Sequence, residues 1–135
     1  MIASEDRAAL DIAIEGSLAR IRDRAAELGD GFAALGEAIG RAARGGKRFR
    51  PALVTASFRA FGGDPASTPS VMSVAAAFEL LHTAFVVHDD VIDHDIVRRG
   101  VPNIGGEFRR RGQESGADAE GAATLGDAEA ILAGD

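Results

Sequence analysis

The chain has 135 residues, of which 46% are hydrophobic and 27% are charged, and this balance is typical of one folded domain rather than a disordered chain. The formal net charge of −6 argues against nucleic acid as a partner, because phosphate binding needs a basic surface. The absence of cysteine excludes disulfides and thiolate metal sites, so any metal must be held by oxygen or imidazole.

The first 61 residues read as three helices. Acidic residues near the N-terminus replace the basic region of a secretory signal, which favours a cytoplasmic location. Apolar spacing predicts an amphipathic helix over residues 4–28 and a second helix from Phe32 to the glycine pair at 45–46. A third helix is expected to begin near Pro51, because proline suits a first helical turn.

After a loop over residues 62–70, the spacing predicts a long helix from Val71 to Val97. It is the most apolar segment, and we expect it to be enclosed by other helices. Glu79 and His82 interrupt the apolar run, which is also short for a bilayer span of about 20 apolar residues, so no stable membrane insertion is expected.

Residues 100–122 are rich in glycine and charge, and we expect a long, mobile connection within a single domain of residues 1–135. A helical pattern then resumes and reaches Asp135 without a stop signal, which suggests a part of a longer domain. The run Arg109–Arg111 reads as a solvated charge run and is assigned no chemistry. No strand-like alternation persists, so the predicted fold class is all-α.

Four aspartates lie within seven positions at the end of the long helix. Asp89 and Asp93 are four residues apart and share a helix face, with Asp90 beside them. Such a pair can bind Mg²⁺, which takes oxygen ligands and commonly joins carboxylates to substrate phosphates. An exposed acidic helix end is the alternative, but the C-terminal end of a helix disfavours anions, which makes that explanation weaker here.

Basic residues near the aspartates could hold a second anion. In GGKRFRP, residues 45–51, Lys47 and Arg50 are three apart and could converge on one diphosphate, although a solvated basic turn explains the motif alone about as well. His82 lies seven residues before Asp89, on the same face and about 10 Å away, but a lone histidine is more often structural. Arg98 and Arg99 could serve two different anions. His88 and His94 are assigned no role.

Together these motifs resemble the all-trans isoprenyl diphosphate synthases of the polyprenyl synthetase family. GGKRFRP is similar to the family's early lysine and arginine motif, and FELLHTAFVVHDDVIDHDIVRRG to its first aspartate-rich motif. LGDAEAILAGD is similar to the helix that follows. The resemblance implies an antiparallel helical bundle around a deep cavity, of which these residues would be a truncated part, and a homodimer in the full-length form.

The resemblance also implies a prenyltransferase of the farnesyl or geranylgeranyl type, which joins an allylic diphosphate to isopentenyl diphosphate. Asp89 and Asp93 would hold Mg²⁺ on the allylic diphosphate, with Asp90 supporting them. Arg98 would contact the same diphosphate. The residues implied to bind isopentenyl diphosphate are Lys47, Arg50, His82 and Arg99, and those implied to set product length are Leu81, Ala84 and Phe85. For the last three, core packing is the alternative.

The family's second aspartate-rich motif and its lysine- and glutamine-bearing segments are absent from these residues. The 135 residues alone are therefore expected to have little or no activity. One alternative is a non-catalytic half or partner subunit of such a synthase. A class I terpene cyclase fits less well, because those pockets rely on aromatic side chains and the chain has no Trp or Tyr. The allylic substrate and the product length stay open.

Overall fold

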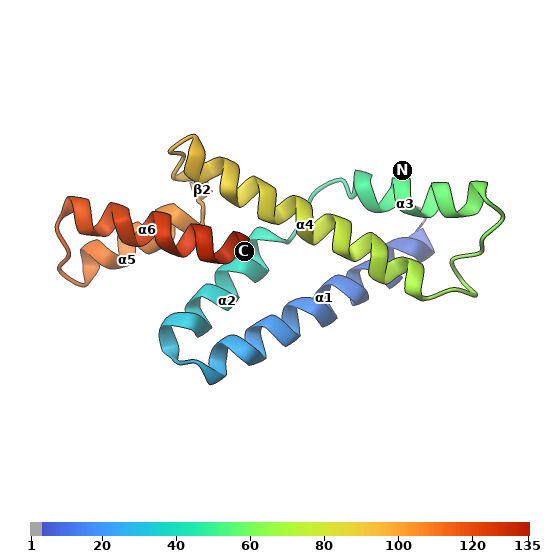
Figure 1. Cartoon of the computed structure of the whole chain (residues 1–135), viewed down its shortest axis with the longest axis horizontal. Helices are drawn as coiled ribbons and strands as arrows, with labels where there is room; N and C mark the ends of the chain where they lie inside the picture. Colours follow the sequence, from blue (N-terminus) through green and yellow to red (C-terminus); the bar gives the residue numbers. More distant parts are fainter. Residues whose placement is uncertain (1–3) are drawn as a thin grey trace.

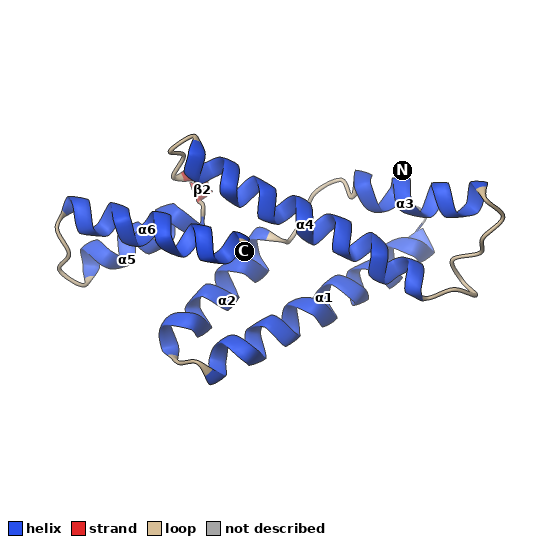
Figure 2. Cartoon of the chain, viewed as in Figure 1, coloured by secondary structure: helices blue, strands red, loops and turns tan. Residues whose placement is uncertain are grey.

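The computed structural model describes residues 4–135, and helices account for nearly all of their regular structure (Figure 2). A hairpin of two very short strands is the one exception in this range. The elements in chain order are α1 (Ser4–Glu27), α2 (Asp30–Ala42), α3 (Phe49–Ala60), α4 (Ser70–Ile92), β1 (Val97–Arg98), β2 (Val101–Pro102), α5 (Ile104–Glu114) and α6 (Ala119–Gly134). The all-α prediction is confirmed.

Consecutive helices form three pairs, α1 with α2, α3 with α4, and α5 with α6 (Figure 1). Helix α4 runs through the middle of the molecule and contacts both α1 and α3 near its start and α6 near its end. Helix α2 ends at Ala42, close to the glycine pair at 45–46 as the sequence predicts, and both glycines take positive φ angles, 81° and 85°. Helix α3 begins at Phe49, two residues before Pro51.

Two apolar clusters hold α4 in place. The first lies between α1, α3 and the first half of α4, and the second joins the last half of α4 to α2, α5 and α6. Leu10, Leu18 and Ala75 are fully or almost fully buried in the first cluster, and Val87 and Phe108 are buried in the second. Burial of apolar surface of this kind stabilises the fold by roughly 25 cal/mol per Å².

One face of α4 lies at the surface, so the prediction of an enclosed helix is wrong for the residues described. Its large exposed side chains follow helical spacing and are Val74, Phe78, Leu81, Phe85 and Ile92. We call these five residues the apolar stripe. Neighbouring helices cover only the opposite side, because α1, α3 and α6 all pack there.

Helix α4 is also the one helix within residues 4–135 that is long and apolar enough to cross a membrane by length and composition. Its most apolar window has a mean hydropathy of 1.7 and is 33% buried. The core helix of a soluble protein passes the same test, so length and composition do not decide between the two environments.

The long connection predicted over residues 100–122 is not free of regular structure, because residues 104–114 form α5 and residues 119–122 begin α6. Asn103 caps this helix, because its side-chain oxygen accepts a hydrogen bond from the Gly106 N–H at 2.9 Å. Ile104 and Phe108, one turn apart, are buried in the second cluster. Arg109, Arg110 and Arg111 consequently lie on a helix, where Arg111 pairs with Glu107 at 2.9 Å.

Candidate functional site

Helix α4 ends at Ile92, five residues earlier than the sequence predicts, and a Schellman motif explains the end. The N–H of Asp95 donates to the carbonyl of Asp90 at 2.8 Å, and that of His94 donates to the carbonyl of Val91 at 3.2 Å. His94 takes the left-handed conformation, with φ 57°, at the position where glycine is usual.

Of the four aspartates at the end of α4, the three predicted to act in the site lie in two different environments. Asp90 is buried, with 5% of its surface exposed, whereas Asp89 and Asp93 are exposed. Asp93 is the C-cap residue, and its N–H donates to the carbonyl of Asp89 at 2.9 Å, so the two carboxylates stay one turn apart as predicted. Neither carboxylate forms a side-chain hydrogen bond or ion pair within residues 4–135.

Arg98 accounts for the burial of Asp90. Its Nε donates to both carboxylate oxygens, at 3.0 and 3.1 Å, and its Nη2 also contacts Oδ1. The hydrogen bond to Asp90 raises the pKa of Arg98, and nearby Asp95 and Asp89 contribute in the same direction. Arg98 is therefore held at the base of the motif by Asp90.

The hairpin after α4 separates Arg98 from Arg99. Its two-residue loop is Arg99 and Gly100, with φ angles of 54° and 81°, as a type I′ turn requires. Arg98 points to Asp90, whereas Arg99 lies against the turn at Gly45 and Gly46. The Arg99 Nη1 is 3.7 Å from the point that a Cβ would occupy if Gly45 carried one. The two arginines thus reach different partners.

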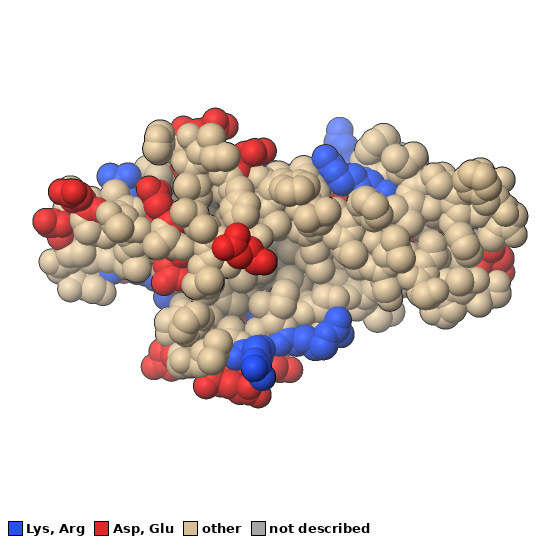
Figure 3. Space-filling model, viewed as in Figure 1, with Lys and Arg blue, Asp and Glu red and all other residues tan. Residues whose placement is uncertain are grey.

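We call residues 45–50 the basic turn. Lys47 and Arg50 are exposed and form no side-chain hydrogen bond or ion pair in the part of the chain that the structure describes. A group of Lys and Arg atoms projects above the connection between α2 and α3, while Asp and Glu atoms lie near the end of α4 (Figure 3). The structure brings Arg99 to the basic turn, and His82 lies half-buried on α4 without a side-chain partner among residues 4–135.

The residues expected to line a tail-binding surface lie on α4 before Asp89. Leu81 and Phe85 belong to the exposed apolar stripe, with Phe85 58% exposed, and Ala84 is half-buried between them. Phe85 is one turn before Asp89, so the stripe leads directly to the free carboxylates. Core packing, the alternative for these side chains, does not account for Leu81 and Phe85 within the residues described.

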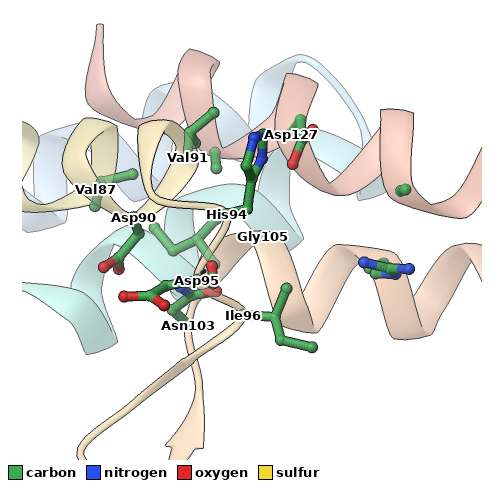
Figure 4. Close-up of a pocket in the computed structure, with 13 residues that line it drawn as sticks. Val87, Asp90, Val91, His94, Asp95, Ile96, Asn103, Gly105 and Asp127 are labelled. Atoms are coloured by element: carbon green, nitrogen blue, oxygen red, sulfur yellow. Dashed lines mark hydrogen bonds between the residues drawn. The ribbon is translucent and has the colours of Figure 1, made fainter.

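A cavity of about 250 Å³ lies between the end of α4, the residues that flank the hairpin, α5 and α6. Asp90, Asp95 and Asn103 lie on one side of it, and His94 and Asp127 lie together on another (Figure 4). Asp89, Asp93 and the basic turn do not line this cavity. The predicted site residues therefore do not come together in this cavity.

The carboxylates at the end of α4 are the candidate ligands for a divalent cation. No group of three or more His, Asp or Glu side chains suited to a metal is gathered within residues 4–135. Two free carboxylates one turn apart nonetheless fit Mg²⁺, because this ion commonly takes one or two protein carboxylates and completes its octahedron with water and substrate phosphates. Asp89 and Asp93 thus fit, and Asp90 does not, since Arg98 occupies its oxygens.

Sequence reasoning missed a buried ion pair between the basic turn and α4. Arg48, between the two predicted ligands Lys47 and Arg50, is buried and donates to Glu79 at 3.0 Å. The available signal was Glu79 itself, because an acid inside an apolar helix needs a cationic partner when buried. His88 was also assigned no role, and it contacts α6 through the Ile131 carbonyl at 3.3 Å.

Comparison with known proteins gives the family. Residues 33–135 match the family model for polyprenyl synthetase. Over 126 residues the chain is 36% identical to a farnesyl diphosphate synthase of Geobacillus stearothermophilus, covering 91% of this chain and 34% of the relative. The chain belongs to the polyprenyl synthetase family, and its all-α structure is consistent with the isoprenoid synthase fold.

Two shorter matches have higher sequence identity. The chain is 48% identical over 60 residues to a short chain isoprenyl diphosphate synthase of Methanothermobacter thermautotrophicus, covering 44% of this chain and 18% of the relative. It is 50% identical over 60 residues to a geranylgeranyl diphosphate synthase of Mycobacterium tuberculosis, covering 44% and 16%. The chain thus spans about a third or less of the length of these relatives. No solved structure gave a significant match.

Proposed function

We propose that this chain provides the first aspartate-rich motif and the isopentenyl diphosphate site of a prenyltransferase. In that reaction the C–O bond of an allylic diphosphate breaks and pyrophosphate leaves. The double bond of isopentenyl diphosphate forms a new C–C bond to the allylic carbon, and a proton is lost. Relatives named as farnesyl and geranylgeranyl diphosphate synthases support this reaction.

The observation that carries the proposal is the arrangement along α4. The free carboxylates of Asp89 and Asp93 stand at one end of an exposed apolar stripe, and the basic turn with Arg99 forms a separate cationic region. This arrangement suits a ligand with an anionic head and an apolar tail. A cation would join the head to the carboxylates, and the tail would lie on the stripe. A second anion fits Lys47, Arg50, His82 and Arg99.

Asp89 and Asp93 would hold Mg²⁺ against the allylic diphosphate, and the ion would stabilise negative charge on the leaving group. Asp90 keeps Arg98 beside that position, so that its charge faces the same diphosphate. Leu81, Ala84 and Phe85 would contact the growing tail and shield the allylic carbon from water. The type of product, farnesyl or geranylgeranyl, depends on how much of the tail this surface admits.

The chain as a whole is proposed to act in the cytoplasm, without stable insertion in a membrane, and in a homodimeric enzyme. Its alternative role is that of a non-catalytic half that pairs with a chain carrying the second aspartate-rich motif. The free carboxylates favour a catalytic contribution over a purely structural one, because unpaired acids at a helix C-terminus destabilise the free protein.

Binding is the first test. Calorimetric titration of the 135-residue chain with a non-hydrolysable farnesyl thiodiphosphate should show binding that requires Mg²⁺. The double variant Asp89→Ala/Asp93→Ala should lose at least about tenfold in affinity, since the charge that holds the cation is removed. Asp23→Ala, a change of an exposed aspartate on α1, serves as the matched control and should bind normally.

Elongation is then measured in the same mixture with carbon-labelled isopentenyl diphosphate and a panel of allylic diphosphates. We expect little or no product from these residues alone, because the family's second aspartate-rich motif is not among them. Binding that is independent of Mg²⁺, or equal in the double variant, would contradict the proposed site.

A further inference from the structure

The basic turn contains one arginine that cannot face a ligand. Lys47 and Arg50 are exposed, whereas Arg48 has only 6% of its surface exposed. Arg48 also adopts the left-handed conformation, with φ 53° and ψ 41°, just before α3 begins. A non-glycine residue holds this conformation only where its surroundings require it, so the contacts of Arg48 must be specific.

Those contacts join several elements. The Nη1 of Arg48 donates to Glu79 Oε1 on α4 at 3.0 Å and to the carbonyl of Ala43, just after α2, at 3.2 Å. Its Nε lies 3.9 Å from Asp11 on α1 and is buried without a hydrogen bond. Glu79 is itself buried, with 8% exposed, so the pair is shielded from water.

Glu79 lies at a defined place relative to the predicted site. It precedes His82 by three residues on α4, so the two side chains are neighbours on adjacent turns. Its Oε1 lies 3.7 Å from the point that a Cβ would occupy if Gly46 carried one, so the turn packs closely on the helix. The link from Arg48 to Glu79 therefore sets where the basic turn sits along α4.

We propose that Arg48 and Glu79 form a positioning pair that holds Lys47 and Arg50 beside His82 and Arg99 for binding the diphosphate of isopentenyl diphosphate. Neither member of the pair touches the ligand. The inference rests on the proposed function for the identity of the ligand. The placement of the turn rests on the contacts alone.

The test is calorimetric titration of the chain with isopentenyl diphosphate in the absence of divalent metal. Arg48→Lys and Glu79→Gln should each weaken binding by about tenfold or more, because a displacement of about 1 Å at a positioned group is costly. Both variants should keep Mg²⁺-dependent binding of farnesyl thiodiphosphate within about twofold, since Asp89 and Asp93 are unchanged. Lys47→Ala, which removes a direct contact, should lose binding of isopentenyl diphosphate.

Asp6→Asn is the matched control for a general loss of stability. Asp6 on α1 is also buried, and its two carboxylate oxygens accept hydrogen bonds from Arg59 on α3, at 2.6 and 3.0 Å. Arg59 lies nine residues after Arg50, away from the basic turn. The Asp6→Asn variant should lower the melting temperature as Glu79→Gln does while leaving the affinity for isopentenyl diphosphate unchanged. An equal loss of affinity in Asp6→Asn would overturn the positioning role.

Hydrogen exchange tests the positioning role of Arg48 and Glu79 separately from the proposed binding of isopentenyl diphosphate. Over residues 42–54, exchange should rise in Glu79→Gln and stay at the wild-type rate in Asp6→Asn, whether or not a ligand binds. Wild-type exchange in Glu79→Gln would overturn the positioning pair.

If exchange rises but the wild-type chain binds no isopentenyl diphosphate, the pair positions the turn and the proposed function is wrong. If Lys47→Ala loses binding while Arg48→Lys and Glu79→Gln bind normally, the function stands and the positioning inference is wrong.

Discussion

At the scale of single residues, the aspartate motif divides into structural and free members. Asp90 is buried and paired with Arg98, and its neighbours Asp89 and Asp93 are exposed and unpaired in the described part of the chain. The free pair also stands at a helix C-terminus, where the backbone carbonyls repel anions. Under the proposed function, Asp90 contributes to stability, whereas Asp89 and Asp93 bind the cation at a cost in stability.

Asp90→Asn should destabilise the fold, because Arg98 loses its charged partner and a buried amide cannot accept both guanidinium hydrogen bonds. The loss expected is about 1–3 kcal/mol in the free energy of unfolding, measured by urea denaturation. Asp93→Asn should change stability by less than about 0.5 kcal/mol, or raise it slightly, because it relieves repulsion at the helix end. Equal losses in the two variants would refute this division of roles.

Glu129 on α6 gives a pH-dependent prediction. Burial raises the pKa of its carboxyl above the ordinary value. In the pH interval between the unfolded and folded pKa values the folded state binds more protons, so stability should fall as pH rises through that interval. Glu129→Gln should remove this dependence and be more stable than the wild type at pH 7, with the difference disappearing in acid. Thermal melts from pH 3.5 to 7 would show it, and parallel profiles would contradict it.

At the scale of elements, close backbone approach decides how α5 and α6 pair. A Cβ on Gly126 would lie 2.5 Å from the carbonyl oxygen of Gly105 and 3.1 Å from the Cβ of Arg109. The first of these contacts is with backbone, which cannot move aside as a flexible side chain does. The small residue therefore allows the two helices to pack at this distance, and the pair supports the wall of the cavity beside Asp90.

Gly126→Ala should cost about 1–3 kcal/mol through overpacking. Gly16→Ala is the matched control, since this glycine lies in α1 and its added Cβ would meet only the tip of Arg20, at 3.9 Å. That substitution should stabilise the helix by about 0.5–1 kcal/mol. Chemical denaturation of both variants measures the contrast, and the same sign of effect in both would count against close packing as the cause.

At the scale of the whole molecule, the main unexplained surface is the apolar stripe of α4. A stripe with several large side chains at roughly half exposure is unusual for a monomeric soluble protein and marks a surface that binds something. In the proposed enzyme that partner is the prenyl tail together with the helices that would enclose it. Without them, the chain should be prone to self-association.

The double variant Phe78→Ser/Phe85→Ser should therefore reduce self-association and binding of a hydrophobic dye, with little change in the melting temperature, because both side chains are half exposed or more. Sedimentation velocity over a range of concentrations measures the association. Phe61→Ser is the control, since Phe61 is 93% exposed and lies outside the stripe. An equal effect from Phe61→Ser would show that the stripe has no special role.

Much of this architecture is predictable from local signals. Periodic apolar residues and glycine stops give α1, α2, α3 and the start of α4, because each signal lies within the element it defines. Helix α5 was missed because its glycines and arginines outweigh two buried apolar positions, although Asn103 is a valid N-cap signal. The end of α4 could not be predicted, since a histidine takes the left-handed position there.

The site shows the same limit. Spacing along one helix predicts that Asp89 and Asp93 share a face, because it depends only on helical geometry. The contacts of Arg98 with Asp90, and of Arg99 with the basic turn, depend on a hairpin whose strands have only two residues each. The pairing of Arg48, just before α3, with Glu79 on α4 spans 31 positions, and no local pattern specifies such a contact.

Because Glu79, His82 and Asp89 all lie on the uninterrupted helix α4, their angular phase around the helix axis is tied to the number of residues between them. One residue inserted between His82 and Asp89 would turn one proposed diphosphate site about 100° away from the other, even with every side chain unchanged. Seven inserted residues would restore the direction but lengthen the separation by about 10 Å. The sequence interval from Glu79 to Asp89 is therefore constrained in length as well as in composition.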